Sequence, residues 1–473
     1  MQTLLILLVG QAMAVMDGSI FTVAAPSLRA NLGASDAELQ LVMTMYVIAF
    51  GALVVTGARL GDVLGRRRAF LLGLAGFTLA SLGGGLAPSP PALILARVAQ
   101  GAAAALMTPQ VLSIIQAQYE GETRARAIGA YSVILAVGVA AGQILGGLVV
   151  GAHLVAAAWR PALLLNVPIG LALLAAARRG LPEIPAASRP RLDLAGAALL
   201  SAALLAFVFP LTFGRAAGWP DWVWPCLAAC ALALAAFPAL ERRVAARGAD
   251  PLFDLRLLRV PAIAAGVAAV SLVMGCYAGF LITLTLHLQD GLGFSPLHAG
   301  ATFAIYACGF AAAGLTWTRA GAALRERLPV LGPLVMGGAL LGVGLVAAGG
   351  GWPLAETSAL LVAAGAGHAC AFSPLAARMT TAVASDRVAH LSGLVLTASL
   401  VGQVTGVASL SGVYLGAAGS GSAHALALTT AVIAPVLVVT AGCALLATRR
   451  GRPARRRQPP ARRGARSRAE ASR

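Results

Sequence analysis

Apolar segments of about twenty residues recur from one end of this 473-residue chain to the other, and they restrict its fold more than any other feature. A helix that crosses a bilayer needs about 20 mainly apolar residues. Charged residues make up only 11% of the chain, whereas soluble domains average about 25%. A soluble fold would leave much of this apolar sequence exposed to water. The sequence therefore predicts a protein that crosses a membrane many times.

The segments have the length of helices rather than of membrane strands. Transmembrane β-strands would show as alternating stretches of about ten residues, and the apolar segments do not alternate in this way. We therefore expect an all-α membrane protein with fourteen transmembrane helices. The predicted spans cover residues 4–26, 39–58, 69–87, 91–115, 127–151, 161–178, 194–213, 222–240, 261–288, 297–317, 329–348, 354–375, 389–416 and 425–447.

The arginines give the expected orientation. All 35 basic residues are Arg, and 31 of them lie in alternate loops or in the C-terminal tail, against three in the opposite loops. Cytoplasmic loops carry the excess of basic residues. We therefore expect a multi-pass protein of a bacterial plasma membrane with both termini in the cytoplasm. Ala12-Met13-Ala14 looks like a signal-peptidase site, but no basic residue precedes it, so an uncleaved first span is expected.

The net charge of +18 is concentrated in the tail, residues 448–473, which is rich in Arg, Pro and Ala. Such a segment cannot bury a core, and we expect it to be disordered and to rest on anionic lipid rather than on nucleic acid. The six Cys lie in or beside apolar spans, which predicts packing residues rather than disulfides or metal ligands. No cofactor is expected.

Two side chains of fixed charge lie well inside predicted spans, Asp17 in the first and Arg97 in the fourth. A charge at the centre of a membrane helix costs roughly 2.5–3.5 kcal/mol on insertion scales, so such residues are candidates for function. They may neutralise each other structurally, or Asp17 can hold either a proton or a cationic substrate. Gln100 shares a helix face with Arg97 because residues three apart are neighbours on a helix.

Glycines mark two further regions. In the fifth span Gly138, Gly142 and Gly146, followed by Gly147, form a smooth ridge suited to close helix packing. The short loop after the second span combines Gly61, Asp62, Gly65 and Arg66, which can make charge–dipole contacts with helix ends.

Among the histidines of the later spans, His368 sits deepest, in a run of small residues. It could titrate near neutral pH in a cavity, or it could be a packing residue with its polar atoms satisfied.

These motifs resemble those of the major facilitator superfamily. The loop motif is carried by Leu60, Gly61, Asp62, Gly65, Arg66 and Arg67, and the fourth-span motif by Leu93, Arg97, Gln100 and Gly101. The fifth span is similar to the antiporter motif of the family, with Gln143 where that motif has Pro. Asp17 to Pro26, Asn166 to Gly170 and Gly293 to Leu297 narrow the resemblance to the fourteen-span drug:proton antiporters.

The resemblance implies a domain arrangement. It consists of a six-helix bundle over residues 1–178, a linker with two extra helices over 179–260, a second six-helix bundle over 261–447 and the tail. In such transporters the halves rock about a central site. The resemblance implies that Asp62 and Arg66 belong to a gating loop and that Asp17 and Arg97 couple transport to protons.

The expected function is proton-coupled export of hydrophobic small molecules, such as drugs or antibiotics, by a monomer that acts as a transporter and not as an enzyme. Import of a small metabolite on the same fold is the alternative that Gln143 keeps open. A membrane sensor or enzyme is the least favoured reading, because the sequence has no phosphate loop, nucleophile elbow or metal-ligand spacing.

Overall fold

The computed structural model describes residues 2–120, 123–124, 126–131, 133–134, 138, 141–142, 145, 159–183, 193–214, 218–247, 253–383 and 387–449. Within these ranges the chain forms helices and no strands. The helices are α1 (Gln2–Leu32), α2 (Asp36–Leu64), α3 (Arg66–Gly85), α4 (Pro90–Gln118), α6 (Arg160–Leu164), α7 (Asn166–Gly180), α8 (Leu194–Phe213), α9 (Val223–Ala246), α10 (Pro261–Leu286), α11 (Pro296–Thr316), α12 (Ala322–Ala348), α13 (Leu354–Thr381), α14 (Val388–Ala417) and α15 (Ser422–Arg449). Short helical turns η1 (Leu255–Arg259), η2 (His287–Gly291), η3 (Trp317–Arg319) and η5 (Ala418–Ser420) lie between them.

These helices confirm the all-α membrane fold. In the described part of the chain, eleven helices are long and apolar enough to cross a bilayer, and Gln2–Gly18 and Ala195–Leu211 are shorter apolar segments. Each predicted span except the fifth coincides with a described helix, and the sixth corresponds to α6 and α7 together. The fifth, 127–151, falls mostly outside the described residues.

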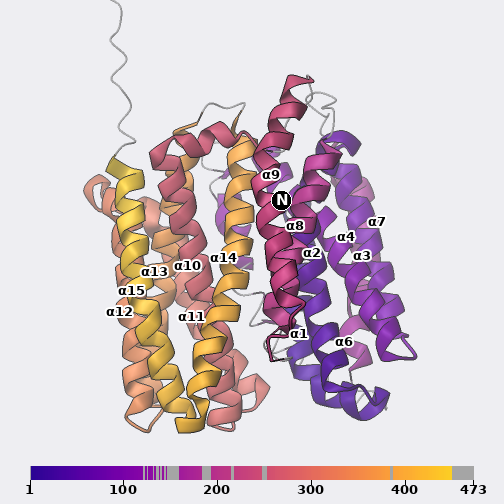
Figure 1. Cartoon of the computed structure of the whole chain (residues 1–473). Helices are drawn as coiled ribbons and strands as arrows, with labels where there is room; N and C mark the ends of the chain where they lie inside the picture. The colour runs from indigo at the N-terminus through magenta and orange to yellow at the C-terminus, as the bar shows by residue number, and fades with distance from the viewer. Residues whose placement is uncertain are drawn as a thin grey trace, which may run out of the picture.

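The helices gather in two groups, with α8 and α9 between them in the view of Figure 1. In the first group α4 packs on α2 and α3, and α7 packs on α1 and α3. In the second, α10 packs on α14 and α15, and α13 packs on α11 and α12. The α8 helix packs on α9 and on α2, and it also contacts α14. The inserted pair therefore touches both groups.

Glycine allows the closest of these approaches. A Cβ on Gly402 of α14 would overlap the Ser271 carbonyl oxygen of α10, and one on Gly406 would overlap the Gly275 carbonyl. The two backbones are thus in direct contact, as small residues permit in membrane helices.

Four apolar clusters form the core, and one of them joins the two groups. Two clusters contain buried residues of the first group alone and one contains buried residues of the second group alone. The fourth, here called the joining cluster, draws on α2, α4, α8, α9 and the second group. Its buried members are Val54, Val55, Ala105, Ala197, Leu200, Leu204, Phe237, Phe253, Leu257, Ile263, Ala269, Val270, Leu375, Met379, Leu391, Leu394 and Ala444.

The joining cluster lies toward the end of the bundle that carries the Arg-rich loops. The α2 helix ends there, just before Arg66, and α10 begins there, just after Arg259. Apolar side chains of both groups therefore pack together at this end of the described structure.

Candidate functional site

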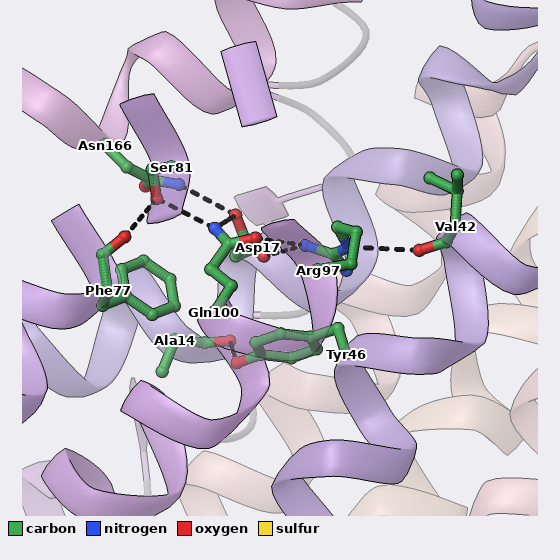
Figure 2. Close-up of polar contacts among 9 residues, drawn as sticks. All are labelled: Ala14, Asp17, Val42, Tyr46, Phe77, Ser81, Arg97, Gln100 and Asn166. Carbon is green, nitrogen blue, oxygen red and sulfur yellow. Dashed lines mark hydrogen bonds and ion pairs between the residues drawn. The ribbon is translucent and has the colours of Figure 1, made fainter. Parts of the chain in front are cut away.

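A cluster of polar side chains lies inside the first group of helices, although each helix is mainly apolar. Asp17 comes from α1, Ser81 from α3, Arg97 and Gln100 from α4, and Asn166 from the start of α7. All five side chains are buried. Figure 2 shows them pointing toward one another around the Asp17 carboxylate.

Both oxygens of the Asp17 carboxylate accept hydrogen bonds. Arg97 Nη1 donates to Oδ2 and forms an ion pair with it. Oδ1 accepts from Gln100 Nε2 and from Asn166 Nδ2, each at 2.8 Å. Asp17 is only 2% exposed, so these donors replace the water that the carboxylate loses. A buried charge is tolerated when it is paired and hydrogen-bonded in this way.

The Arg97 guanidinium is held from several sides and is fully buried. Its Nε donates to the Val42 carbonyl oxygen of α2 at 3.1 Å, and its Nη1 also donates to Gln100 Oε1 at 2.8 Å. Its Cζ lies 4.6 Å from the centre of the Tyr46 ring, in cation–π geometry. The Tyr46 hydroxyl donates in turn to the Ala14 carbonyl oxygen at 2.7 Å. Arg97 thereby links α1, α2 and α4.

Gln100 extends the network to a third helix. Its Nε2 lies 2.9 Å from Ser81 Oγ, and the Ser81 hydroxyl donates to the Phe77 carbonyl oxygen at 2.8 Å. The amide therefore contacts Asp17, Arg97 and Ser81 at once. A shift of any of these helices would alter the hydrogen bonds of the carboxylate.

A small cavity of about 90 Å³ borders Asp17. Asn166 is its other polar lining residue, and the remaining walls are apolar, including Met13, Met16 and Ile169. A water molecule occupies about 30 Å³ in the liquid. The cavity therefore has room for a few water molecules next to the carboxylate. It is too small for a drug-sized ligand.

The Asp17 carboxylate and the Arg97 guanidinium compensate each other's charge inside the first group. Removing one of the two charges would leave the other buried and uncompensated, which typically costs about 3–5 kcal/mol. The arrangement of α1 against α4 therefore depends on this pair.

The predicted gating loop is built around the junction of α2 and α3. Gly65 separates the two helices with φ of +86°, a conformation that favours glycine. Asp62 Oδ2 lies 3.8 Å from Arg59 Nη1 in a partly exposed ion pair. Arg66 Nη1 donates to the Ser113 carbonyl oxygen of α4 at 3.0 Å. The loop is thus fastened to the end of α4.

The other glycine of the loop motif serves a close contact between helices. A Cβ on Gly61 would overlap the Gln110 side chain, whose Nε2 donates to the Gly57 carbonyl oxygen at 2.9 Å. Gln110 is buried in α4. Sequence reasoning did not single it out, because one amide in an apolar helix gives little signal.

One polar contact crosses between the two groups at the Arg-rich end. Arg59 Nη2 of α2 lies 3.2 Å from His390 Nδ1 of α14. Arg59 also pairs with Asp62. The gating loop therefore reaches the second group through Arg59, beside the joining cluster.

The glycine ridge of the fifth span is described only in part. A Cβ on Gly138 would come within 2.9 Å of Val15 Cγ1, so this glycine packs against α1 close to Asp17. Gly142 is helical and buried. Gln143, Gly146 and Gly147 lie outside the described residues.

His368 lies apart from the Asp17 network, in the second group of helices. It is 3% exposed, and its Nδ1 lies 3.0 Å from the Tyr306 hydroxyl of α11. The rings of Tyr277 and Phe310 pack against the imidazole at centroid distances of 4.7 and 4.8 Å.

Sequence reasoning missed several partners in the first group. Asn166, Ser81 and Tyr46 are uncharged, and uncharged polar residues are common in membrane helices, so their positions carried no clear signal. Asp193 and Glu241, which flank the predicted spans 194–213 and 222–240, are both buried beside Gly196, where α8 meets α9.

Comparison with known proteins agrees with this architecture. The chain is 40% identical over 297 residues to the probable actinorhodin transporter of Streptomyces coelicolor, a match that covers 63% of this chain and 51% of that protein. It thus spans about half the length of that relative. It is 33% identical over 459 residues to the puromycin resistance protein pur8 of Streptomyces alboniger, covering 93% and 89% of the two chains.

A solved structure shows the same fold at low sequence identity. The human organic anion transporter MFSD10 (TETRAN) superposes with a TM-score of 0.66 at 15% identity, covering 94% of this chain and 99% of that one. The sequence model of the Major Facilitator Superfamily matches residues 7–319, which hold the Asp17 network, the gating loop and the inserted helices. From this match and the fold together, the chain belongs to the Major Facilitator Superfamily.

Proposed function

We propose that this chain exports hydrophobic small molecules in exchange for protons, with Asp17 as the proton-binding group. The observation that carries the proposal is the buried Asp17–Arg97 pair, whose hydrogen-bond partners come from α2, α4 and α7. Relatives named for antibiotic export and resistance favour export over import.

In the proposed cycle, the charge of Asp17 decides which arrangement of the first group is stable. The deprotonated carboxylate holds Arg97 and the amides of Gln100 and Asn166, as in this structure. Water in the adjoining cavity delivers a proton to it. The Arg97 guanidinium has then lost its counter-charge, and α1 and α4 shift to positions where other polar groups stabilise it.

The shift is passed on at the contacts between the two halves. Residues 1–178 and 261–447 move as two bundles, with 179–260 as the linker, and the joining cluster and the Arg59–His390 contact open at the cytoplasmic end. In this scheme both termini are cytoplasmic, and the chain works as a monomer in a bacterial plasma membrane.

The driving force is sufficient for useful accumulation. One charge that moves through 100 mV supplies about 2.3 kcal/mol, which corresponds to a gradient of roughly 50-fold at about 1.4 kcal/mol per decade. A pH gradient adds to this.

The test is drug-dependent proton movement in everted membrane vesicles, read with a pH-sensitive dye and challenged with puromycin and uncharged aromatic compounds. We expect proton release on addition of substrate in the wild type and none in Asp17→Asn. Asp221→Asn is the matched control, because Asp221 is exposed in the loop between α8 and α9.

Asp17→Asn alone leaves Arg97 unpaired and could lower the amount of folded protein. The double variant Asp17→Asn/Arg97→Gln restores neutrality, and it should insert normally while still failing to move protons. Substrate-dependent proton release by this double variant would refute the role assigned to Asp17.

A further inference from the structure

One nitrogen of the buried His368 ring has no hydrogen-bond partner. Nδ1 is engaged by the Tyr306 hydroxyl at 3.0 Å, whereas Nε2 is buried without any partner. A polar atom buried in this way usually lowers stability by about 1–3 kcal/mol. An unsatisfied group of this kind in a transporter points to a ligand that satisfies it.

The surroundings of this nitrogen are aromatic. Tyr277 of α10 tilts over the imidazole at 4.7 Å, and Phe310 of α11 meets it edge-on at 4.8 Å. Tyr277 also stacks on Tyr306 at 5.8 Å. Tyr277 and Phe310 are partly exposed, whereas His368 and Tyr306 are buried. The two outer rings thus cover the imidazole.

The cover lies one helical turn beyond the joining cluster. Met274 and Phe372 pack against that cluster. Tyr277 follows Met274 by three residues along α10, away from the Arg-rich end, and His368 precedes Phe372 by four along α13, in the same direction. Residues three or four apart share a helix face, so Tyr277 and His368 continue the helix faces whose Met274 and Phe372 contact the cluster shared by the two groups.

The chemistry of the free nitrogen selects the ligand. When His368 Nδ1–H donates to the Tyr306 hydroxyl oxygen, Nε2 is an acceptor, and a ligand hydroxyl group can donate to it. The rings that surround it favour a flat aromatic body, and its immediate contacts carry no charge.

We infer that His368 and its aromatic cover form a substrate subsite for planar, uncharged aromatic molecules that bear a hydroxyl group. The ligand slides between Tyr277 and Phe310, and its hydroxyl pairs with His368 Nε2. This inference rests on the proposed export function and names its substrate class.

The test measures binding of 7-hydroxyflavone and 7-methoxyflavone to the whole chain in lipid nanodiscs by calorimetry, with empty nanodiscs as the partition control. The methyl ether keeps the flat body but cannot donate. We expect the wild type to bind the hydroxyl compound about fivefold more tightly, the value of one hydrogen bond. Equal affinity for the two compounds would overturn the inference.

Three variants then test whether His368 causes the preference for the hydroxyl compound over the methyl ether. His368→Phe should abolish the difference in affinity between the two compounds, and His368→Gln should keep part of it. Tyr119→Phe removes a tyrosine hydroxyl at the end of α4, in the other group of helices, so the preference should remain. A preference that survives His368→Phe would contradict the assignment.

The binding assay needs no proton gradient, so its outcome is separate from that of the vesicle assay. A preference for the hydroxyl compound without substrate-dependent proton movement would support the subsite and refute the exchange mechanism. Proton exchange without that preference would support the exchange mechanism and refute the subsite.

Discussion

Removing one partner of the Asp17–Arg97 pair should harm the protein more than removing both. Asp17→Asn leaves a fully buried guanidinium without its counter-charge, and Arg97→Gln leaves the carboxylate with only the Gln100 and Asn166 amides. Breaking a buried pair in this way lowers the free energy of unfolding by about 3–5 kcal/mol.

The double variant Asp17→Asn/Arg97→Gln removes both charges together. What remains to be lost includes the bonds from Arg97 to the Val42 carbonyl oxygen and to Gln100, at about 1 kcal/mol each, and the cation–π contact with Tyr46, at about 0.5–1 kcal/mol. We therefore expect the double variant to be destabilised by roughly 3 kcal/mol, far less than the sum of the single variants.

The assay is unfolding of the purified protein by SDS titration in mixed micelles, followed by tryptophan fluorescence. The control pair is Arg67→Gln/Glu183→Gln, because that ion pair is 3.2 Å long but Glu183 is 70% exposed. Exposed pairs contribute about 0–1 kcal/mol, so all control variants should unfold close to the wild type. If the losses of Asp17→Asn and Arg97→Gln simply add in the double variant, the two side chains are not energetically coupled and the reasoning fails.

Two further predictions concern the contacts between helices. Gly57→Ala should lower the free energy of unfolding by about 1–3 kcal/mol, since the added Cβ would overlap the Ala105 carbonyl oxygen. Gly51→Ala is the control and should change little, because the space around its Cβ is open. The same SDS titration compares the two variants, and equal effects would contradict the packing. Cysteines at positions 59 and 390, in a chain whose native Cys are replaced, should be bridged by a short bifunctional maleimide, since Arg59 and His390 lie 3.2 Å apart. The bridge should stop transport in vesicles, and full activity after bridging would show that this contact does not open.

The sequence predicted the helices well because the physical signal was strong. Twenty apolar residues admit few structures in lipid, so thirteen of the fourteen spans match described helices. Asp17 and Arg97 were found for the same reason, since fixed charges stand out in apolar sequence. Their contact could not be derived from spacing, because it depends on how α1 packs against α4.

The uncharged parts of the site were much harder to predict. Asn166 begins α7 and reaches Asp17 across 149 positions of sequence, a pairing that no local pattern encodes. The Tyr306–His368 bond likewise joins two helices through a tyrosine that resembles an ordinary packing residue. A charged side chain in a membrane helix is costly enough to be recognised from the sequence alone, whereas the role of an amide or a hydroxyl depends on which side chains lie next to it.

The separation of Asp17 and Arg97 along the chain has a consequence for biogenesis. Asp17 is in α1, which emerges from the ribosome before α4, and its counter-charge follows eighty residues later. At about 5–20 residues per second, this leaves an interval of roughly 4–16 s. During that time the Asp17 side chain of nascent α1 must be protonated, or α1 must remain in the polar surroundings of the insertion machinery. The α1 helix is therefore stable in the bilayer only after α4 has been inserted beside it.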